Sequence, residues 1–261
     1  MIVEGHRSML GGEMDVWNYT DAPVVVREDL ADAHRRIATW ISLPGTWLSG
    51  AERVAVVEEA RRADECVLCA DRKQALSPFG VDGEHDRGSE LSAPIVDLVH
   101  RVRTDPGRLS KRWFDGLEAE GVPDTVYVEV LSLVALSASL DAFARALGVA
   151  LRPLPEPVAG EPTRVRPESA QLDIAWVPLV DPEAATGPEA ELFGAGWWPN
   201  VGRALSLVPD AVRELLPLME AQYIPLGDVA HATRPVQHRA ISRAQMEVIA
   251  SRVSAINECF Y

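Results

Sequence analysis

The feature that most constrains this chain is a helical segment that it contains twice. Residues 48–69 read LSGAERVAVVEEARRADECVLC, and residues 241–261 read ISRAQMEVIASRVSAINECFY. When Cys66 is set on Cys259, the two copies align without a gap. A segment of this length repeated in register indicates a tandem duplication of one helical unit.

Both copies carry the same helix signals. Each opens with a capping box, Ser49-x-x-Glu52 and Ser242-x-x-Gln245, which predicts that a helix begins at the same place in each. Apolar residues then recur at i, i+4, i+7 and i+11, the spacing of one helix face. These residues are Val56, Ala60, Ala63 and Val67 in the first copy and Ile249, Val253, Ile256 and Phe260 in the second.

The composition argues against several classes of protein. A formal charge of -14 over 261 residues disfavours nucleic acid or an anionic membrane surface as the partner. No segment approaches the ~18 apolar residues of a membrane span, and the N-terminus does not read as a signal peptide. Three cysteines, two of them spaced as Cys66-x-x-Cys69, suggest redox or metal chemistry rather than a secreted disulfide framework. We therefore expect a cytoplasmic protein.

Helical patterns elsewhere predict an all-α fold. Besides the two copies, the predicted helices cover residues 29–42, 94–103, 110–120, 125–147, 200–207 and 210–223, and Gly148 ends the fourth of them as a C-cap.

The domain organisation follows from these helices and from a proline-rich stretch. Residues 1–27 form an N-terminal arm and residues 28–150 a first helical unit. Residues 151–189 are too rich in proline for a helix and read as a linker. Residues 190–261 form a second, apparently incomplete unit. Because that unit lacks a following helix, we expect a partner chain or further residues to cover its apolar face.

The Cys66-x-x-Cys69 spacing has a chemical interpretation. A cysteine at a helix N-terminus is favoured as the thiolate, which is the nucleophilic form, and a second cysteine one turn later can resolve a sulfenic acid. Arg72 and Lys73 follow closely and could stabilise a thiolate. The alternative is two buried cysteines that pack as small hydrophobic residues. Zinc fits less well, because the sequence shows no second cysteine pair and no His-x3–5-His.

The second copy resembles a known family. The pattern Glu247-x11-Cys259, within Ser-Arg-x-Gln-Met-Glu and Cys-Phe-Tyr, is similar to the alkyl hydroperoxidase D and carboxymuconolactone decarboxylase superfamily. Its redox-active members carry Glu-x11-Cys-x-x-Cys-x-x-x-His, and this sequence ends inside that motif. The resemblance implies that Glu247 is a general base and Cys259 one of the cysteine pair. On one straight helix the two would lie about 18 Å apart, so we expect the helix to break near Asn257.

The first copy matches the same motif differently. The resemblance implies that Cys66 and Cys69 are the peroxidatic and resolving cysteines, in either order. Val54 occupies the position of the glutamate and Lys73 that of the histidine, so the proton relay of the family is missing here. Four residues could substitute, although each is more commonly a charge on a solvated helix face. They are Glu58, Glu59, Asp71 and His100.

The resemblance implies a thiol-dependent peroxidase. A cysteine thiolate would attack a small-molecule hydroperoxide, the partner cysteine would close a disulfide, and a dithiol or thioredoxin-like protein would reduce it. This chemistry requires no flavin, haem or metal. The alternatives are a non-redox decarboxylase-like enzyme of the superfamily and a catalytically inactive binding or structural member. Family members commonly form trimers or hexamers, which implies a homo-oligomer.

Two further features are weaker signals. His85 lies between Glu84 and Asp86 and could bind a cation, although a polar surface loop is the commoner role for such a segment. A run of basic residues is typical of a solvated face or, at best, of a site for an anion or an acidic partner. This run comprises Arg101, Arg103, Arg108, Lys111 and Arg112.

Overall fold

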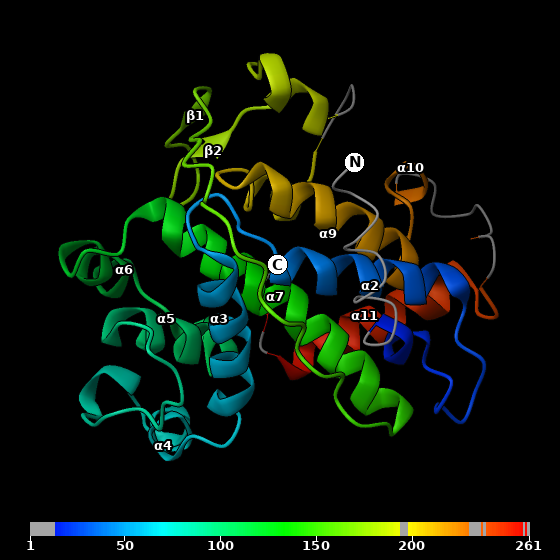
Figure 1. The fold of residues 1–261 in the computed structure, drawn as a ribbon, viewed down its shortest axis with the longest axis horizontal. Helices are drawn as coiled ribbons and strands as arrows, with labels where there is room; N and C mark the ends of the chain where they lie inside the picture. Colours follow the sequence, from blue (N-terminus) through cyan, green and yellow to red (C-terminus); the bar gives the residue numbers. More distant parts are fainter. Residues whose placement is uncertain (1–13, 194–197, 230–235, 237–238, 258, 260–261) are drawn as a thin grey trace.

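The computed structural model describes residues 14–193, 198–229, 236, 239–257 and 259. Helices dominate this part of the chain (Figure 1), and its strands form a single two-stranded antiparallel ribbon, β1 (Ala170–Gln171) and β2 (Leu179–Val180). The all-α class is therefore confirmed. The division into tandem units and their family type remain predictions.

Residues 14–150 contain six α-helices at or close to the predicted positions. They are α2 (Glu28–Ser42), α3 (Gly50–Ala63), α4 (Val67–Gln74), α5 (Ala93–Thr104), α6 (Lys111–Ala119) and α7 (Asp124–Leu147). Gly148 ends α7 with a φ of 70°, the left-handed conformation predicted for a C-cap glycine. Three short 3-10 helices lie among these helices: η1 (Met14–Asn18), η2 (Pro78–Gly80) and η3 (Pro106–Arg108). A fourth, η4 (Gly187–Leu192), follows later in the chain.

A hydrophobic core forms where α3, α5 and α7 pack on one another, and α2 lies between this group and α9 (Pro209–Gln222) (Figure 1). Leu98 of α5 and Leu133 of α7 are fully buried in this core. The same core includes Trp17 from the predicted arm and Leu218 of α9. Residues on both sides of the proline-rich segment thus share one core.

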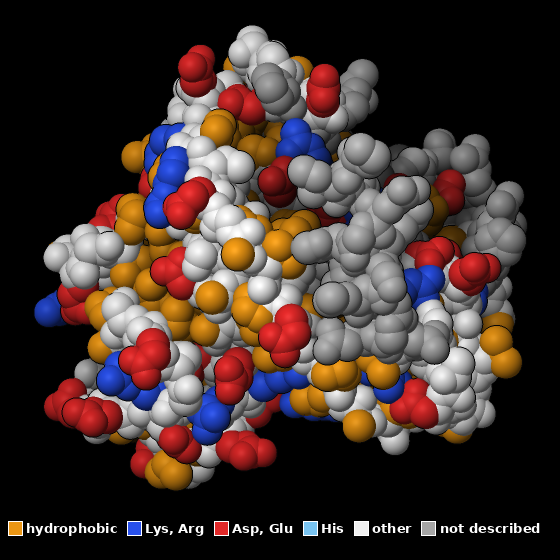
Figure 2. All heavy atoms as spheres, in the orientation of Figure 1, with side chains coloured by type: hydrophobic (Ala, Val, Ile, Leu, Met, Phe, Trp, Pro, Cys, Tyr) orange, Lys and Arg blue, Asp and Glu red, His pale blue; other side chains and the backbone are white. Residues whose placement is uncertain are grey.

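Helix α7 is long and apolar enough to cross a membrane by composition, contrary to our expectation that no segment approaches this limit. It lies in the protein core, where 61% of its most apolar window is buried. Core helices of soluble proteins pass the same test, so its length and composition are explained by burial within the protein. On the face drawn in Figure 2, acidic and basic side chains alternate and neither sign gathers into one patch.

A buried ion pair crosses the core. The Arg53 guanidinium of α3 contacts the Glu129 carboxylate of α7, and their side chains are 1% and 0% exposed. Arg53 also donates to the carbonyl of Trp40 at 2.8 Å, and its guanidinium stacks over the Trp40 ring. Glu129 accepts the backbone N–H of Trp47 at 2.6 Å. These contacts fix the loop between α2 and α3, and with it the start of α3.

The proline-rich segment, residues 151–189, forms no α-helix, as predicted, and only its end belongs to the 3-10 helix η4. It runs along the loop after α2 and is held by backbone hydrogen bonds from Val158 to Ser42 and from Thr163 to Gly45. The next helix, α8 (Asn200–Arg203), is shorter than the predicted 200–207. Pro209 begins α9, and a proline disfavours helical conformation in the residue before it, so the chain turns between the two helices.

The two copies begin alike and pack differently. Both predicted capping boxes form, at the start of α3 and of α11 (Arg243–Ile256), which follows the short helix α10 (Leu226–Val229). Val56, Ala60 and Ala63 of α3 are buried, whereas Ile249 and Val253 of α11 are 55% and 50% exposed. The repeated stripe therefore packs into a core only in the first copy. The exposed face of α11 agrees with an uncovered apolar surface in the second copy.

The ends of the two repeated segments differ from the predicted pattern in part. The prediction that Val67 is buried was wrong, because α3 ends at Ala63 and α4 starts in a new direction, which leaves Val67 72% exposed. Phe260 lies outside the described residues. The helix break predicted near Asn257, within the second copy, is confirmed, since α11 ends at Ile256 with Asn257 as its C-cap.

Candidate functional site

The two cysteines of the Cys-x-x-Cys motif begin helix α4. Cys66 is the N-cap residue and Cys69 is the third residue of the helix. A three-residue spacing places both side chains on the same end of the helix, and their sulfur atoms lie within 4.8 Å of each other. Both residues are buried, with exposures of 2% and 4%. The predicted position of a cysteine at a helix N-terminus is thus observed.

A histidine and a glutamate form a chain that ends at Cys69. His100 of α5 places Nδ1 3.2 Å from the sulfur of Cys69. Its Nε2 lies 3.1 Å from Oε1 of Glu59 on α3, and both side chains are 0% exposed. Oε2 of Glu59 accepts hydrogen bonds from the hydroxyl of Ser89 at 2.6 Å and the backbone N–H of Gly88 at 3.3 Å. Glu59 is therefore an acceptor for three donors.

A second histidine reaches the sulfurs from the loop between α4 and α5. His85 Nδ1 lies 3.6 Å from the sulfur of Cys66 and 3.6 Å from that of Cys69. Its Nε2 lies 3.0 Å from Oδ1 of Asp97 on α5, and 3.1 Å from Nη1 of Arg72. Since Arg72 itself donates to Asp97 at 2.8 Å, the carboxylate is the acceptor that both groups share.

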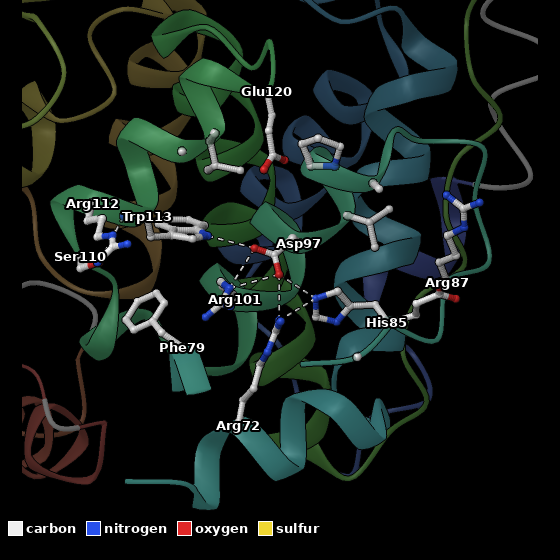
Figure 3. A pocket seen from close by; sticks show the side chains of 17 residues that line it. Arg72, Phe79, His85, Arg87, Asp97, Arg101, Ser110, Arg112, Trp113 and Glu120 are labelled. Atoms are coloured by element: carbon white, nitrogen blue, oxygen red, sulfur yellow. Dashed lines mark hydrogen bonds and ion pairs between the residues drawn. The ribbon is translucent and has the colours of Figure 1, made fainter. Parts of the chain in front are cut away.

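Asp97 is the centre of a cluster of donors (Figure 3). Besides His85 and Arg72, it accepts from Arg101 at 2.9 Å and from the indole N–H of Trp113 at 2.9 Å. Burial alone would raise the pKa of Asp97, but hydrogen bonds from His85 and Trp113 and the nearby guanidinium groups hold that pKa well below its usual range. Asp97 is thus a carboxylate that orients the residues around it.

The pKa values of the two thiols shift in opposite directions. For Cys66, burial opposes ionisation, yet the backbone N–H groups of Cys69 and Asp86 and the His85 ring together lower its pKa. Burial raises the pKa of Cys69 to about 12. Burial also lowers the pKa of His100, so its ring is neutral at pH 7 and can accept a proton. The arrangement provides one thiol of lowered pKa, one thiol of raised pKa and a neutral imidazole that can act as a base.

A large pocket lies beside these thiols. It has a volume of about 800 Å³ and is lined by Trp113, Phe79 and charged side chains from α4 to α6 (Figure 3). A much smaller cavity of about 10 Å³ borders Cys69. Arg72, His85 and Arg101 line both spaces and so lie between the pocket and the Cys69 thiol.

The structure brings some of the predicted site residues together. Arg72 lies at the site, where its guanidinium binds Asp97. Burial raises the pKa of Cys69, and the charge of Arg72 offsets a small part of this shift. Glu59 and His100, proposed as substitutes for the missing relay, both reach the site. Lys73 is exposed on the outside of α4.

The predicted residues of the second copy lie elsewhere. Glu247 forms an ion pair with Arg243 on the same helix, and Cys259 is exposed. Helix α11 and helix α4 occupy separate parts of the molecule in Figure 1. The four His and Cys ligand atoms that cluster near α4 do not include Cys259. The described residues therefore give one candidate site, centred on the first copy.

Sequence reasoning gave His85 only a weak role and did not single out Asp97. A signal was present for Glu59, because it lies three residues after Val56 and four before Ala63, in the buried stripe of α3. A charged residue at a buried position needs a partner, and His100 supplies it. For His85 and Asp97 no pattern is visible, since their contact depends on how a loop without regular structure folds against α5.

Comparison of the chain with family models, with curated proteins and with solved structures finds no match. The resemblance to the alkyl hydroperoxidase D superfamily therefore remains a prediction based on the sequence motifs.

Proposed function

We propose that this protein is a thiol-dependent oxidoreductase that reduces small hydroperoxides through Cys66 and Cys69. The observation that carries the proposal is the Glu59–His100–Cys69 chain beside a second thiol. It supplies a base and an orienting carboxylate where the sequence motif lacks its usual glutamate. Nucleophile, base and orienting group in hydrogen-bond reach are the arrangement that activated thiols require.

The first step uses Cys66. Its thiolate attacks the terminal oxygen of the hydroperoxide, the O–O bond breaks and the OH group stays on sulfur, while the alkoxide leaves and takes a proton from water to become the alcohol. Cys66 becomes a sulfenic acid. The N-cap position supports this role, because the helix N-terminus stabilises the negative charge on the sulfur.

The second step uses Cys69 and the relay. His100 takes the proton from Cys69 through Nδ1 while its Nε2–H donates to Glu59, and the Cys69 sulfur attacks that of Cys66. Hydroxide leaves, takes up a proton and becomes water as the disulfide forms. The pair thus loses two electrons and two hydrogens to the peroxide, and an external dithiol restores both.

Burial sets the size of the reactants. Cys66 and Cys69 are 2% and 4% exposed, and Arg72 and His85 lie between the large pocket and the small cavity at Cys69, so a reactant must reach buried sulfur atoms. This favours small hydroperoxides and a small dithiol reductant over bulky ones.

The test is peroxide consumption by chelator-treated protein with dithiothreitol as reductant. We expect Cys66→Ser and Cys69→Ser to reduce turnover to background, while Cys259→Ser, a matched control at an exposed position, keeps the wild-type rate. Thermal unfolding of each variant verifies folding. If the wild type consumes no peroxide, the proposal is wrong, and the decarboxylase-like and non-catalytic alternatives take its place.

A further inference from the structure

The redox proposal accounts for only part of the contacts that His85 makes. It uses the contact of His85 with Cys66, but not the contact of His85 with Cys69 or the orientation of His85 by Asp97. His85 comes from residues 81–92, which contain no helix or strand, and its side chain is nonetheless only 8% exposed. A ligand that both histidines and both cysteines share would explain this convergence.

We propose that the reduced protein binds one zinc ion through the sulfurs of Cys66 and Cys69 and the Nδ1 atoms of His85 and His100, and releases it when the cysteines form a disulfide. The binding half stands on the geometry of the four side chains alone. The release half rests on the proposed redox function.

The distances fit a tetrahedral ion. Bonds of about 2.3 Å to sulfur and about 2.0 Å to nitrogen place neighbouring ligand atoms of a tetrahedral zinc ion about 3.3–3.8 Å apart. The sulfur–nitrogen distances in the site are 3.2 Å for Cys69–His100 and 3.6 Å for both contacts of His85. All four ligand atoms lie within 4.8 Å of one another. Small adjustments of side chains would therefore complete the coordination shell.

The groups behind the ligands also fit a metal centre. Each histidine directs Nδ1 toward the sulfurs and has a carboxylate oxygen on Nε2, at 3.1 Å for Glu59 and 3.0 Å for Asp97. Such carboxylates fix the tautomer in which the other nitrogen is available for the metal. Arg72 also lies near Nε2 of His85, but its charge is compensated by Asp97.

The ligand set favours zinc. Two thiolates and two imidazoles are the S₂N₂ combination typical of structural zinc sites, and four protein ligands leave no open position. Both thiolates would be bound, and the ion would neutralise their charge in a buried site. The metal would also tie α4, the loop at His85 and α5 together.

Oxidation removes two of the four ligands. Each thiolate sulfur gives up one electron and one S–S bond forms, while the O–O bond of the hydroperoxide breaks and, with two protons from water, yields an alcohol and water. The zinc ion leaves unchanged as Zn²⁺, because a disulfide sulfur is a poor ligand and two imidazoles alone hold the ion weakly. The reduced pair would thus be stored in a metal-bound form.

The test is titration of the reduced, metal-free protein with Co²⁺ as a spectroscopic substitute for zinc, under anaerobic conditions. We expect one equivalent to bind, with the absorption of tetrahedral cobalt and a thiolate-to-cobalt charge-transfer band. Competition with Zn²⁺ should displace it. We expect His85→Ala and Cys66→Ser to lose the band and Cys259→Ser to keep it. An octahedral spectrum, or binding that His85→Ala does not change, would overturn the proposal.

A variant of Asp97, which hydrogen-bonds the ligand His85, tests the site without removing a metal ligand. Asp97→Asn should weaken zinc binding by about 10- to 100-fold, as removal of such partners does in other metal sites. Asp115→Asn is the matched control, because Asp115 forms an exposed pair with Lys111, and we expect it to bind zinc like the wild type. Equal affinities in both variants would contradict the role of Asp97.

Release is measured separately. One equivalent of hydrogen peroxide added to the zinc-loaded protein should free one equivalent of zinc, detected with a chelating dye, as the disulfide appears by mass. Zinc that binds but stays bound while the disulfide forms overturns the release half. Zinc that binds in a protein whose cysteines resist peroxide supports the metal site and contradicts the redox function. Peroxide-dependent disulfide without any metal binding contradicts the site alone.

Discussion

Replacement of Glu59 by glutamine tests the relay without removing a thiol. Oε1 of Glu59 accepts from Nε2 of His100 at 3.1 Å, and Oε2 accepts from Ser89 and from the backbone N–H of Gly88. An amide has one oxygen and one NH₂ group in place of the two oxygens. If the oxygen stays opposite His100, the NH₂ group meets the N–H of Gly88; if it turns, the NH₂ group meets His100 instead. Either way the charge that stabilises the protonated imidazole is lost.

The magnitude follows from the contact that is removed. Hydrogen bonds to charged groups contribute about 1.5–3 kcal/mol. If the carboxylate stabilises the transition state for disulfide closure by this amount, Glu59→Gln slows closure about 10- to 150-fold. The attack of Cys66 on peroxide does not use the relay, so its rate should change much less.

Rapid-quench mass spectrometry after one equivalent of hydrogen peroxide separates the two steps in chelator-treated protein. We expect the sulfenic acid of Cys66 to accumulate in Glu59→Gln and to close slowly. Glu58→Gln is the matched control: the same substitution one residue away, in a side chain that is 51% exposed and 3.9 Å from Arg62. Equal closure rates in the two variants would refute the relay, since only Glu59 contacts His100.

Three further predictions concern stability and the second copy. Glu129→Gln leaves the Arg53 charge buried without its partner and should lower the free energy of unfolding by about 3–5 kcal/mol. Asp115→Asn, at a pair with Lys111 in which both side chains are 52% exposed, should cost less than about 1 kcal/mol, and urea unfolding that gives equal losses would contradict this. Burial lowers the pKa of His34 from 6.5 to about 4. The contribution of the neutral imidazole to the free energy of unfolding is therefore full above pH 6.5 and falls as the pH drops toward 4. Between pH 7.5 and pH 4.5 the wild type should lose about 2.5 kcal/mol more of its free energy of unfolding than a His34→Gln variant does. Parallel pH profiles of unfolding free energy for the two proteins would refute this prediction. Alkylation should modify Cys259 faster than the two buried cysteines in the native protein, and equal rates would show that the site is open.

The sequence predicts most helices because their signals are local. The capping boxes of α3 and α11, the apolar periodicity of α2 and the glycine after α7 each specify a boundary within a few residues. Burial of the second copy could not be predicted in this way. The same stripe is covered in α3 and exposed in α11, because burial depends on which other helices pack against it.

Some residues of the candidate site could also be predicted from local signals, whereas others depend on tertiary packing. Cys66 and Cys69 are recognisable from their spacing at a helix start, and Glu59 could be found from its place in a buried stripe. The approach of His100 and His85 depends on the packing of α5 on α3 and on the path of the loop before it. Contacts between segments that are distant in the sequence leave no periodic signal in either segment.

The most direct test of the redox function is the mass of the reduced, metal-free protein after one equivalent of hydrogen peroxide. We predict a loss of two hydrogens, a disulfide mapped to Cys66 and Cys69, and recovery of the original mass with dithiothreitol. Cys259→Ser should behave in the same way. An unchanged mass, or a disulfide that requires Cys259, would contradict the proposal that the thiol pair of the first copy is the redox centre.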